Sequence, residues 1–300
     1  MLDPQAAEFL RMVAGSPPLD SIPVEVARAA AGDIAQLAGT QPEGVIAKDL
    51  TVAEVPVRLH LPSSDPGLPA TIYLHGGGWV LGDLDSHHAV AADLARWSRA
   101  SVVAVDYRRA PEDPFPAALD DVIAVVEELL GNGGKYGLDR TRVAIAGDSA
   151  GGNLAAVVAQ RFHELVHQAL IFPVTDAASV GSTESYRKFG EGHFLTTRDM
   201  EFFVNSYAGK TDPSDPRISP LRTPDLAGSP PATVVTAEYD PLRDEGEAYA
   251  ARLEDAGVPV ELRRFDGQVH PFIALGGLIE DANVARRWIG ERLAAAFRAH

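Results

Sequence analysis

The run Gly147-Asp148-Ser149-Ala150-Gly151 places a serine between small residues, in the pattern G-x-S-x-G. An apolar run precedes it and a helix-forming run follows it, which is the context of a tight turn from a strand into a helix. Such a turn exposes the serine hydroxyl, and the N-terminus of the following helix favours a developing negative charge. The pattern predicts a nucleophile at Ser149, with Asp148 as an anchor of the turn rather than a reacting group. A glycine-rich turn that merely starts a helix is the alternative.

A second run, HGGGW at positions 75–79, directly follows another apolar run. Consecutive glycines expose backbone N–H groups, as the oxyanion hole of an acyl-transfer site requires. The run has neither the Lys-Ser/Thr ending of a phosphate-binding loop nor the glycine spacing of a dinucleotide site. We expect the oxyanion donors to be the amides of Gly77, Gly78 and Ala150. Trp79 is expected either to line the substrate pocket or to pack beneath a cap.

An acid and a base follow later in the chain. Asp240 comes shortly after the apolar run 233–236, so it is expected at the carboxyl end of a strand, where catalytic loops of open α/β sheets gather. Asp244 is expected to lie in the first turn of the next helix instead. His270 is expected in the loop after the following strand. The chain order serine, aspartate, histidine is that of α/β-hydrolases, and we predict a triad of Ser149, Asp240 and His270.

Other histidines compete for the role of base or could bind a metal. His87 and His88 are adjacent, so they are expected to point in different directions and to lack the acid-rich neighbourhood of ligands that a metal site needs. The stretch from His163 to His167 reads H-E-x-x-H, a zinc-binding pattern when both histidines share a helix face. We expect it at the end of the helix that begins at Ser149, roughly four turns from the nucleophile. A solvated surface explains the pattern better, and we predict no metal site.

Short apolar runs alternate with helical stretches along most of the chain. The expected strands are 71–74, 102–105, 143–146, 169–172, 233–236 and 258–262. The expected helices are 117–130, 153–162, 246–255 and a last one with Ala285, Ile289, Leu293 and Phe297 on one face. Near-continuous apolar strands between helices are typical of a mostly parallel sheet that helices cover on both sides. We therefore predict an α/β fold of the α/β-hydrolase kind.

Two segments fall outside this alternation. The first 40 residues look helical, and the segment 181–221 is loop-rich, then helical at 197–207, then rich in proline. We predict that they form a helical cap. The expected organisation is a single domain, 1–300, with a cap of about 1–44 and 180–222 and a catalytic core of about 45–179 and 223–300.

Composition excludes several classes of protein. With 26 basic and 42 acidic residues, the net charge of −16 repels nucleic acid and anionic headgroups. The absence of cysteine excludes disulfides and thiol nucleophiles. The N-terminus lacks the pattern of a secretory signal, and no apolar stretch approaches the roughly 20 residues of a membrane span. We expect a cytoplasmic protein with no nucleic-acid partner.

Five motifs together resemble those of the bacterial hormone-sensitive-lipase family of esterases, in the subgroup with aspartate before the nucleophile. They are HGGGW at 75–79, DYRRAPEDPFPAALDD at 106–121, GDSAGG at 147–152, DPRISPL at 215–221 and EYDPLRDEG at 238–246. The resemblance runs from about residue 45 to the C-terminus. It implies the same triad and the same oxyanion loop as the residues themselves suggest.

Three features depart from the pattern of that family. Pro271 follows His270 where glycine is usual, Arg109 stands where an apolar residue is usual, and the stretch 160–168 is short. None of these departures removes a catalytic group.

The expected activity is hydrolysis of small-molecule carboxylic esters with short to medium acyl chains, through an acyl-enzyme and without a cofactor. An amidase, formamidase or carbamate hydrolase with the same triad is one alternative. A non-catalytic ligand receptor on the same fold is another, although plant gibberellin receptors, which resemble this family, lack the histidine that is present here as His270. A homodimer is one assembly that the sequence allows.

Overall fold

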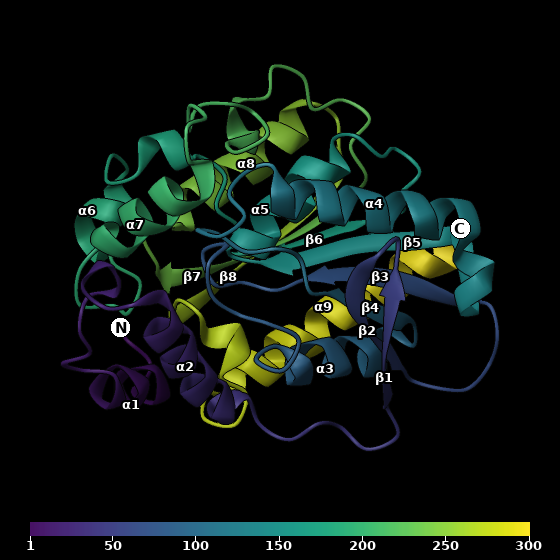
Figure 1. Ribbon diagram of the computed structural model, residues 1–300, viewed down its shortest axis with the longest axis horizontal. Coiled ribbons are helices and arrows are strands. Elements are labelled where there is room, and N and C mark those ends of the chain that lie inside the picture. Colours follow the sequence, from purple (N-terminus) through teal and green to yellow (C-terminus); the bar gives the residue numbers. More distant parts are fainter.

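The computed structural model describes residues 1–300 and is built around one eight-stranded sheet (Figure 1). The strands are β1 (Ile46–Val52), β2 (Val55–Leu61), β3 (Leu68–Leu74), β4 (Ser101–Val105), β5 (Leu138–Asp148), β6 (Gln168–Ile171), β7 (Ala232–Tyr239) and β8 (Val260–Val269). They lie in the order β1-β2-β4-β3-β5-β6-β7-β8. Strand β2 is antiparallel to both of its neighbours, and every pair from β4 to β8 is parallel. The predicted mostly parallel sheet is confirmed.

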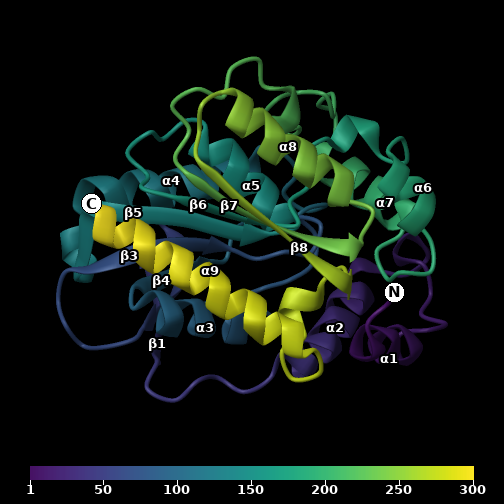
Figure 2. The same cartoon turned by 180° about the vertical axis from the view of Figure 1, so that it is seen from behind.

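Helices cover both faces of the sheet. Helices α4 (Ala117–Asn132), α5 (Ala150–Ala159) and α8 (Arg243–Asp255) lie on one face, and α3 (His88–Ser98) and α9 (Glu280–Ala299) lie on the other (Figures 1 and 2). Side chains alternate between the faces along a strand, so Ile72 and Tyr73 of β3 belong to two different apolar clusters, of 52 and 31 buried residues. The two clusters explain why the central strands are apolar throughout.

Four helices gather at one end of the molecule, beside β7 and β8. They are α1 (Pro4–Met12), α2 (Val24–Ala35), α6 (Glu184–Phe189) and α7 (Thr197–Ala208) (Figures 1 and 2). Helix α7 begins where expected because Thr196 and Asp199 form a reciprocal capping box. The segment before β1 contacts the segment between β6 and β7 through an ion pair between Asp20 and Arg198, at 2.9 Å. The division into cap and core at the boundaries given above stays a prediction.

The structure corrects the extent of several expected elements. The strand expected at 258–262 continues to Val269, so His270 follows the strand directly. It is an edge strand whose exposed residues include Glu261 and Arg264, and this polarity conceals it from a search for apolar runs. The antiparallel hairpin of β1 and β2, and the short helix α6, were not predicted individually. None of the helices is both long and apolar enough to cross a membrane.

Candidate active site

Ser149 stands in a strained turn between β5 and α5. Its φ is 55° and its ψ is −117°, a backbone conformation that non-glycine residues rarely adopt. Close approach of the backbone enforces the turn: a Cβ on Gly147 would lie 2.3 Å from the Gly151 carbonyl oxygen, and one on Gly151 would lie 2.0 Å from that of Leu74. The serine N–H donates to the carbonyl of Ile171 at 2.9 Å. The turn therefore has the nucleophile-elbow geometry that the sequence pattern predicts.

Asp240 and His270 form a hydrogen-bonded pair. Strands β7 and β8 run parallel with Tyr239 opposite Val269, so the residue after each strand end meets the other. His270 Nδ1 lies 2.9 Å from Asp240 Oδ2, and Asp240 Oδ1 accepts the N–H of Leu242 at 2.8 Å. Asp240 is 0% exposed and His270 is 5% exposed. Both carboxylate oxygens are thus occupied, and the carboxylate fixes the orientation of the imidazole.

Ser149 and His270 are not joined by a hydrogen bond in this structure. Phe172, the residue after Ile171, connects their surroundings: its ring meets that of His270 edge-on, with centroids 4.5 Å apart. Hydrogen bonds between a nucleophile and its base are often long before substrate binds and tighten in the complex. The triad of Ser149, Asp240 and His270 stays a prediction, with its acid and base already paired.

The glycine loop after β3 presents unpaired amides. Gly77 and Gly78 have φ values of 115° and 61°, which favour glycine, and their N–H groups have no acceptor within the protein. Ala150 is the first residue of α5, where a helix leaves its N–H groups unpaired. A Cβ on Gly78 would lie 2.2 Å from the ring of Phe203, a residue of α7. The loop can therefore supply donors to an oxyanion. Helix α7 packs directly against this loop through Phe203.

Asp148 ties the nucleophile turn to the glycine loop. Its Oδ1 accepts the N–H of Gly76 at 3.0 Å and the hydroxyl of Tyr73 at 2.6 Å, and its Oδ2 lies 3.4 Å from His87 Nε2. Burial alone would raise the pKa of Asp148, but His87 and the Tyr73 hydroxyl hold that pKa below its usual value. His87 thus has one acidic neighbour, a contact that the sequence did not predict. Nothing in the sequence signals this contact, because the two residues lie on different elements.

Trp79 is enclosed by helix α7. Its ring stacks on Tyr207 of α7, with centroids 4.4 Å apart and an angle of 5° between the planes, and the side chain has no exposed surface. The edge of Phe115 meets the same tyrosine. Of the two roles expected for Trp79, this arrangement favours the packing role, with α7 in the place expected for the cap.

The H-E-x-x-H stretch does not lie on a helix, contrary to expectation. Helix α5 ends at Ala159, and the following residues form turns that lead into β6. His163 is exposed and contacts the carbonyl of Gly228, whereas His167 is buried against the hydroxyl of Thr233, at 2.9 Å. The two imidazoles therefore have separate partners and no shared helix face.

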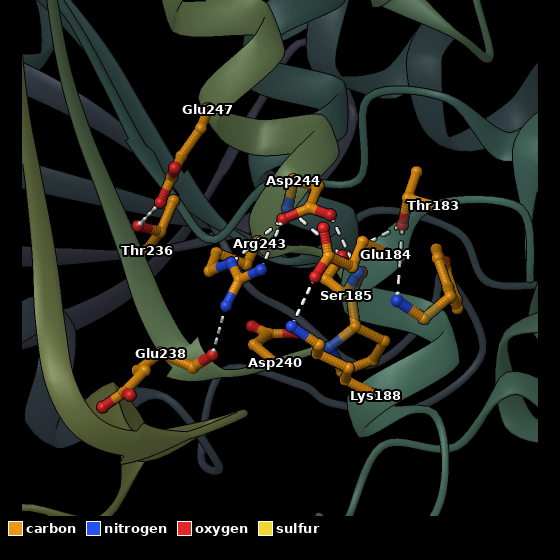
Figure 3. A network of polar contacts seen from close by, with 12 residues as sticks. Thr183, Glu184, Ser185, Lys188, Thr236, Glu238, Asp240, Arg243, Asp244 and Glu247 are labelled. Atoms are coloured by element: carbon orange, nitrogen blue, oxygen red, sulfur yellow. Dashed lines mark hydrogen bonds and ion pairs between the residues drawn. The ribbon is translucent and has the colours of Figure 1, made fainter. Parts of the chain in front are cut away.

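A polar network joins helix α6 to the loop that carries Asp240 (Figure 3). Asp244 lies in the first turn of α8, as predicted, and its Oδ2 accepts the N–H of Ser185 at 2.8 Å. The buried hydroxyl of Ser185 donates to the carbonyl of Pro241 at 2.6 Å. The sequence did not predict this link, which attaches α6 to Pro241 and to Asp244, two residues that follow Asp240.

Comparisons with known proteins agree with this geometry. The profile described as "alpha/beta hydrolase fold" matches residues 71–274. Ethyl acetate hydrolase from Pseudomonas putida is 38% identical over 304 residues, covering 94% of this chain and 95% of that protein. Carboxylic ester hydrolase LipN from Mycobacterium tuberculosis is 40% identical over 265 residues, covering 82% and 67% of the two chains.

The solved structure of a thermostable esterase from Pseudomonas putida ECU1011 superposes with a TM-score of 0.93 at 36% identity, covering 99% of this chain and 98% of that one. The fold, the strained serine turn and the glycine loop define a hydrolase of the serine type. The chain belongs to the α/β-hydrolase fold family, among the esterases of hormone-sensitive-lipase type that its motifs resemble.

Proposed function

We propose that this protein hydrolyses carboxylic esters with Ser149 as nucleophile, His270 as general base and acid, and Asp240 as the residue that orients the imidazole. The protein is a carboxylesterase, in keeping with relatives that are esterases over most of its length. One observation carries the assignment of roles: His270 pairs with Asp240 at 2.9 Å. The pair lies at the carboxyl ends of the parallel strands, where Ser149 is held in its strained turn.

The arrangement supports two-step acyl transfer. His270 takes the proton of Ser149 as the serine oxygen attacks the ester carbonyl, and the amides of Gly77, Gly78 and Ala150 stabilise the negative charge on the carbonyl oxygen. His270 then gives the proton to the leaving alcohol. In the second step it removes a proton from water as the water attacks the acyl-serine, and it returns that proton to the Ser149 oxygen when the bond to the acyl group breaks and the acid is released. Asp240 stabilises the imidazolium that forms in each step.

Small esters with short to medium acyl chains are the proposed substrates. Ser149 is only 6% exposed, and Phe203 of α7 packs directly on the glycine loop, so the enclosed site favours a compact acyl group. The name of the relative that hydrolyses ethyl acetate is consistent with a small ester.

We further propose that the protein is cytoplasmic, from its cysteine-free, acidic composition. The homodimer that the sequence allows is a second proposal, which sedimentation velocity would test.

Hydrolysis of p-nitrophenyl esters of graded acyl length by wild type and Ser149→Ala tests these proposals. We expect rates to peak between acetate and octanoate and to fall on the order of 10⁴-fold or more in the variant. Residual activity above a few per cent in folded Ser149→Ala would contradict the role of the serine. A preference for emulsified long-chain fats would contradict the substrate class.

The alternative of an amidase, formamidase or carbamate hydrolase is not favoured, because the relatives described above are esterases. A matched ester and amide with the same acyl group give the direct comparison. We expect the ester to have the larger kcat/KM. The receptor alternative is not favoured either, since its mark would be the loss of the histidine that His270 supplies.

A further inference from the structure

The loop after β6, residues 172–176, contacts the surroundings of both proposed reacting side chains. Its first residue, Phe172, has a φ of 34° and packs its ring against His270. The N–H of Val174 donates to the carbonyl of Ser149 at 3.3 Å. Since the loop touches the backbone of the serine and the ring of the histidine, its position influences how far apart the two lie.

Glu245, in the first turn of α8, holds this loop. Its Oε1 accepts the backbone N–H groups of Thr175 at 2.7 Å and Asp176 at 3.2 Å. The hydroxyl of Thr175 in turn donates to the backbone carbonyl of Glu245 at 2.7 Å. Glu245 lies five residues after Asp240, so these contacts tie the loop to the element that follows the proposed acid. The side chain makes no hydrogen bond to any triad residue.

Tight packing prevents the loop from adjusting freely. Pro173 lies between the starts of two helices: a Cβ on Gly152 of α5 would lie 3.0 Å from it, and one on Gly246 of α8 would lie 3.5 Å from it. Densely packed interiors transmit small displacements instead of absorbing them. Release of the loop at Thr175 and Asp176 would therefore move Phe172 as well.

We propose that Glu245 is a positioning residue for ester hydrolysis, whose carboxyl group clamps the loop 172–176 and thereby keeps His270 within reach of Ser149. This inference rests on the proposed roles of these two residues. The clamp needs one oxygen acceptor at Oε1, because both backbone amides converge on that atom.

The environment favours an uncharged carboxyl group at this place. Burial, together with the nearby charges of Asp176 and Asp240, raises the pKa of Glu245 to about 8, although the two amides oppose this effect. The buried phenol of Tyr186 faces the same three carboxyl groups, and Glu245 Oε2 has no hydrogen-bond partner. A glutamine offers the same acceptor oxygen without the charge, so it should replace the neutral glutamic acid.

Two variants of Glu245 separate the clamp from mere occupancy of space. Glu245→Gln keeps the acceptor oxygen, and Glu245→Met keeps most of the volume but removes the oxygen. Glu247→Gln is the matched control, because Glu247 lies on the same helix but pairs with Thr236 (Figure 3) and with Arg264 of the edge strand β8. Steady-state kinetics with p-nitrophenyl butyrate, at matched folded fraction by circular dichroism, give kcat and KM for each.

We expect kcat of Glu245→Met to fall on the order of 10- to 100-fold with KM changed less than about twofold, because misplacement of a reacting group affects the chemical step. Glu245→Gln and Glu247→Gln should stay within about threefold of wild type. Wild-type kcat in folded Glu245→Met would overturn the proposal. An equal loss in Glu245→Gln and Glu245→Met would also overturn it, since the oxygen would then not be the decisive feature.

If Glu245→Met does not fold, Thr175→Val tests the same clamp from the loop side. It removes the hydroxyl that donates to the Glu245 carbonyl and keeps the side-chain shape. We expect a several-fold loss of kcat at unchanged KM, and an unchanged kcat would overturn the proposal. Ser149→Ala measured in parallel separates the two levels: an active Ser149→Ala contradicts the proposed function, whereas an inactive one beside an unimpaired Glu245→Met contradicts only the clamp.

Discussion

Asp148 Oδ1 accepts the N–H of Gly76 at 3.0 Å, so the residue before the proposed nucleophile fixes the loop that presents the proposed oxyanion donors. The serine turn and the glycine loop follow different strands, β5 and β3, which are neighbours in the sheet. Their side-by-side strand ends allow one carboxylate to join the two loops. The same oxygen also accepts the buried hydroxyl of Tyr73.

Two substitutions of Asp148 distinguish its role as a hydrogen-bond acceptor from the effect of its negative charge. Asp148→Ala leaves the Gly76 amide and the Tyr73 hydroxyl without their acceptor, at a cost of about 1–3 kcal/mol in the free energy of unfolding for each unpaired buried group. We expect its kcat to fall at least tenfold, on the order of the loss of one oxyanion donor. Asp148→Asn keeps one acceptor oxygen and should lose less. Urea denaturation and kinetics of both variants check this order, and equal losses would contradict it.

The two carboxylates after β7 should have distinct effects. Asp240→Asn should lower kcat about 10⁴-fold, because an amide partner favours the wrong tautomer of His270. Asp244→Asn should cost about 1 kcal/mol of stability or less at the start of α8. This cost includes the weakening of the hydrogen bond that Asp244 accepts from the Ser185 N–H. Kinetics and thermal melts of the two purified variants decide the matter. A larger loss of kcat in Asp244→Asn would show that the acid is misassigned.

Stability should depend on pH through Glu245. Its pKa is raised to about 8 in the folded protein from an ordinary value near 4.5. Its contribution to folding is therefore fully present at low pH and is lost as the pH rises from about 4.5 through about 8. Glu245→Gln does not titrate, so its melting temperature relative to wild type should increase between about pH 5 and pH 9. Differential scanning fluorimetry across this range measures the difference, and a constant difference would contradict the buried neutral carboxyl.

The glycine loop should tolerate no side chain beneath α7. Gly78→Ala places a methyl group 2.2 Å from the ring of Phe203, at a backbone φ of 61° that costs alanine about 1 kcal/mol more. We expect kcat to fall at least tenfold, with partial recovery in the double variant Gly78→Ala, Phe203→Ala because the overlap is removed. Kinetics of the two single variants and the double variant give the coupling. Additive losses would mean that the ring does not press on the loop.

Sequence patterns that depend on near neighbours determine the local structure of this protein. A strained turn needs glycines at fixed offsets from the serine, so Gly147 and Gly151 identified the turn at Ser149. The apolar runs of the central strands identified the parallel sheet, because the burial of a strand is visible in its own consecutive residues. The motif set identified the family, which the comparisons confirm.

Contacts between distant elements were decided by the tertiary structure alone. The edge strand β8 is polar in sequence, which conceals its full length. Helix α5 ends before His163, although the H-E-x-x-H stretch was expected to lie on it. His87 beside Asp148, Ser185 beside Asp244 and Glu245 on the loop after β6 join residues 59 to 70 or so positions apart in the chain. One-dimensional spacing determines local turns and periodic faces, whereas partners of this kind depend on strand order and helix packing. Ser149, Asp240 and His270 could be named from the sequence, but the pairing of His270 with Asp240 follows from the register of β7 and β8.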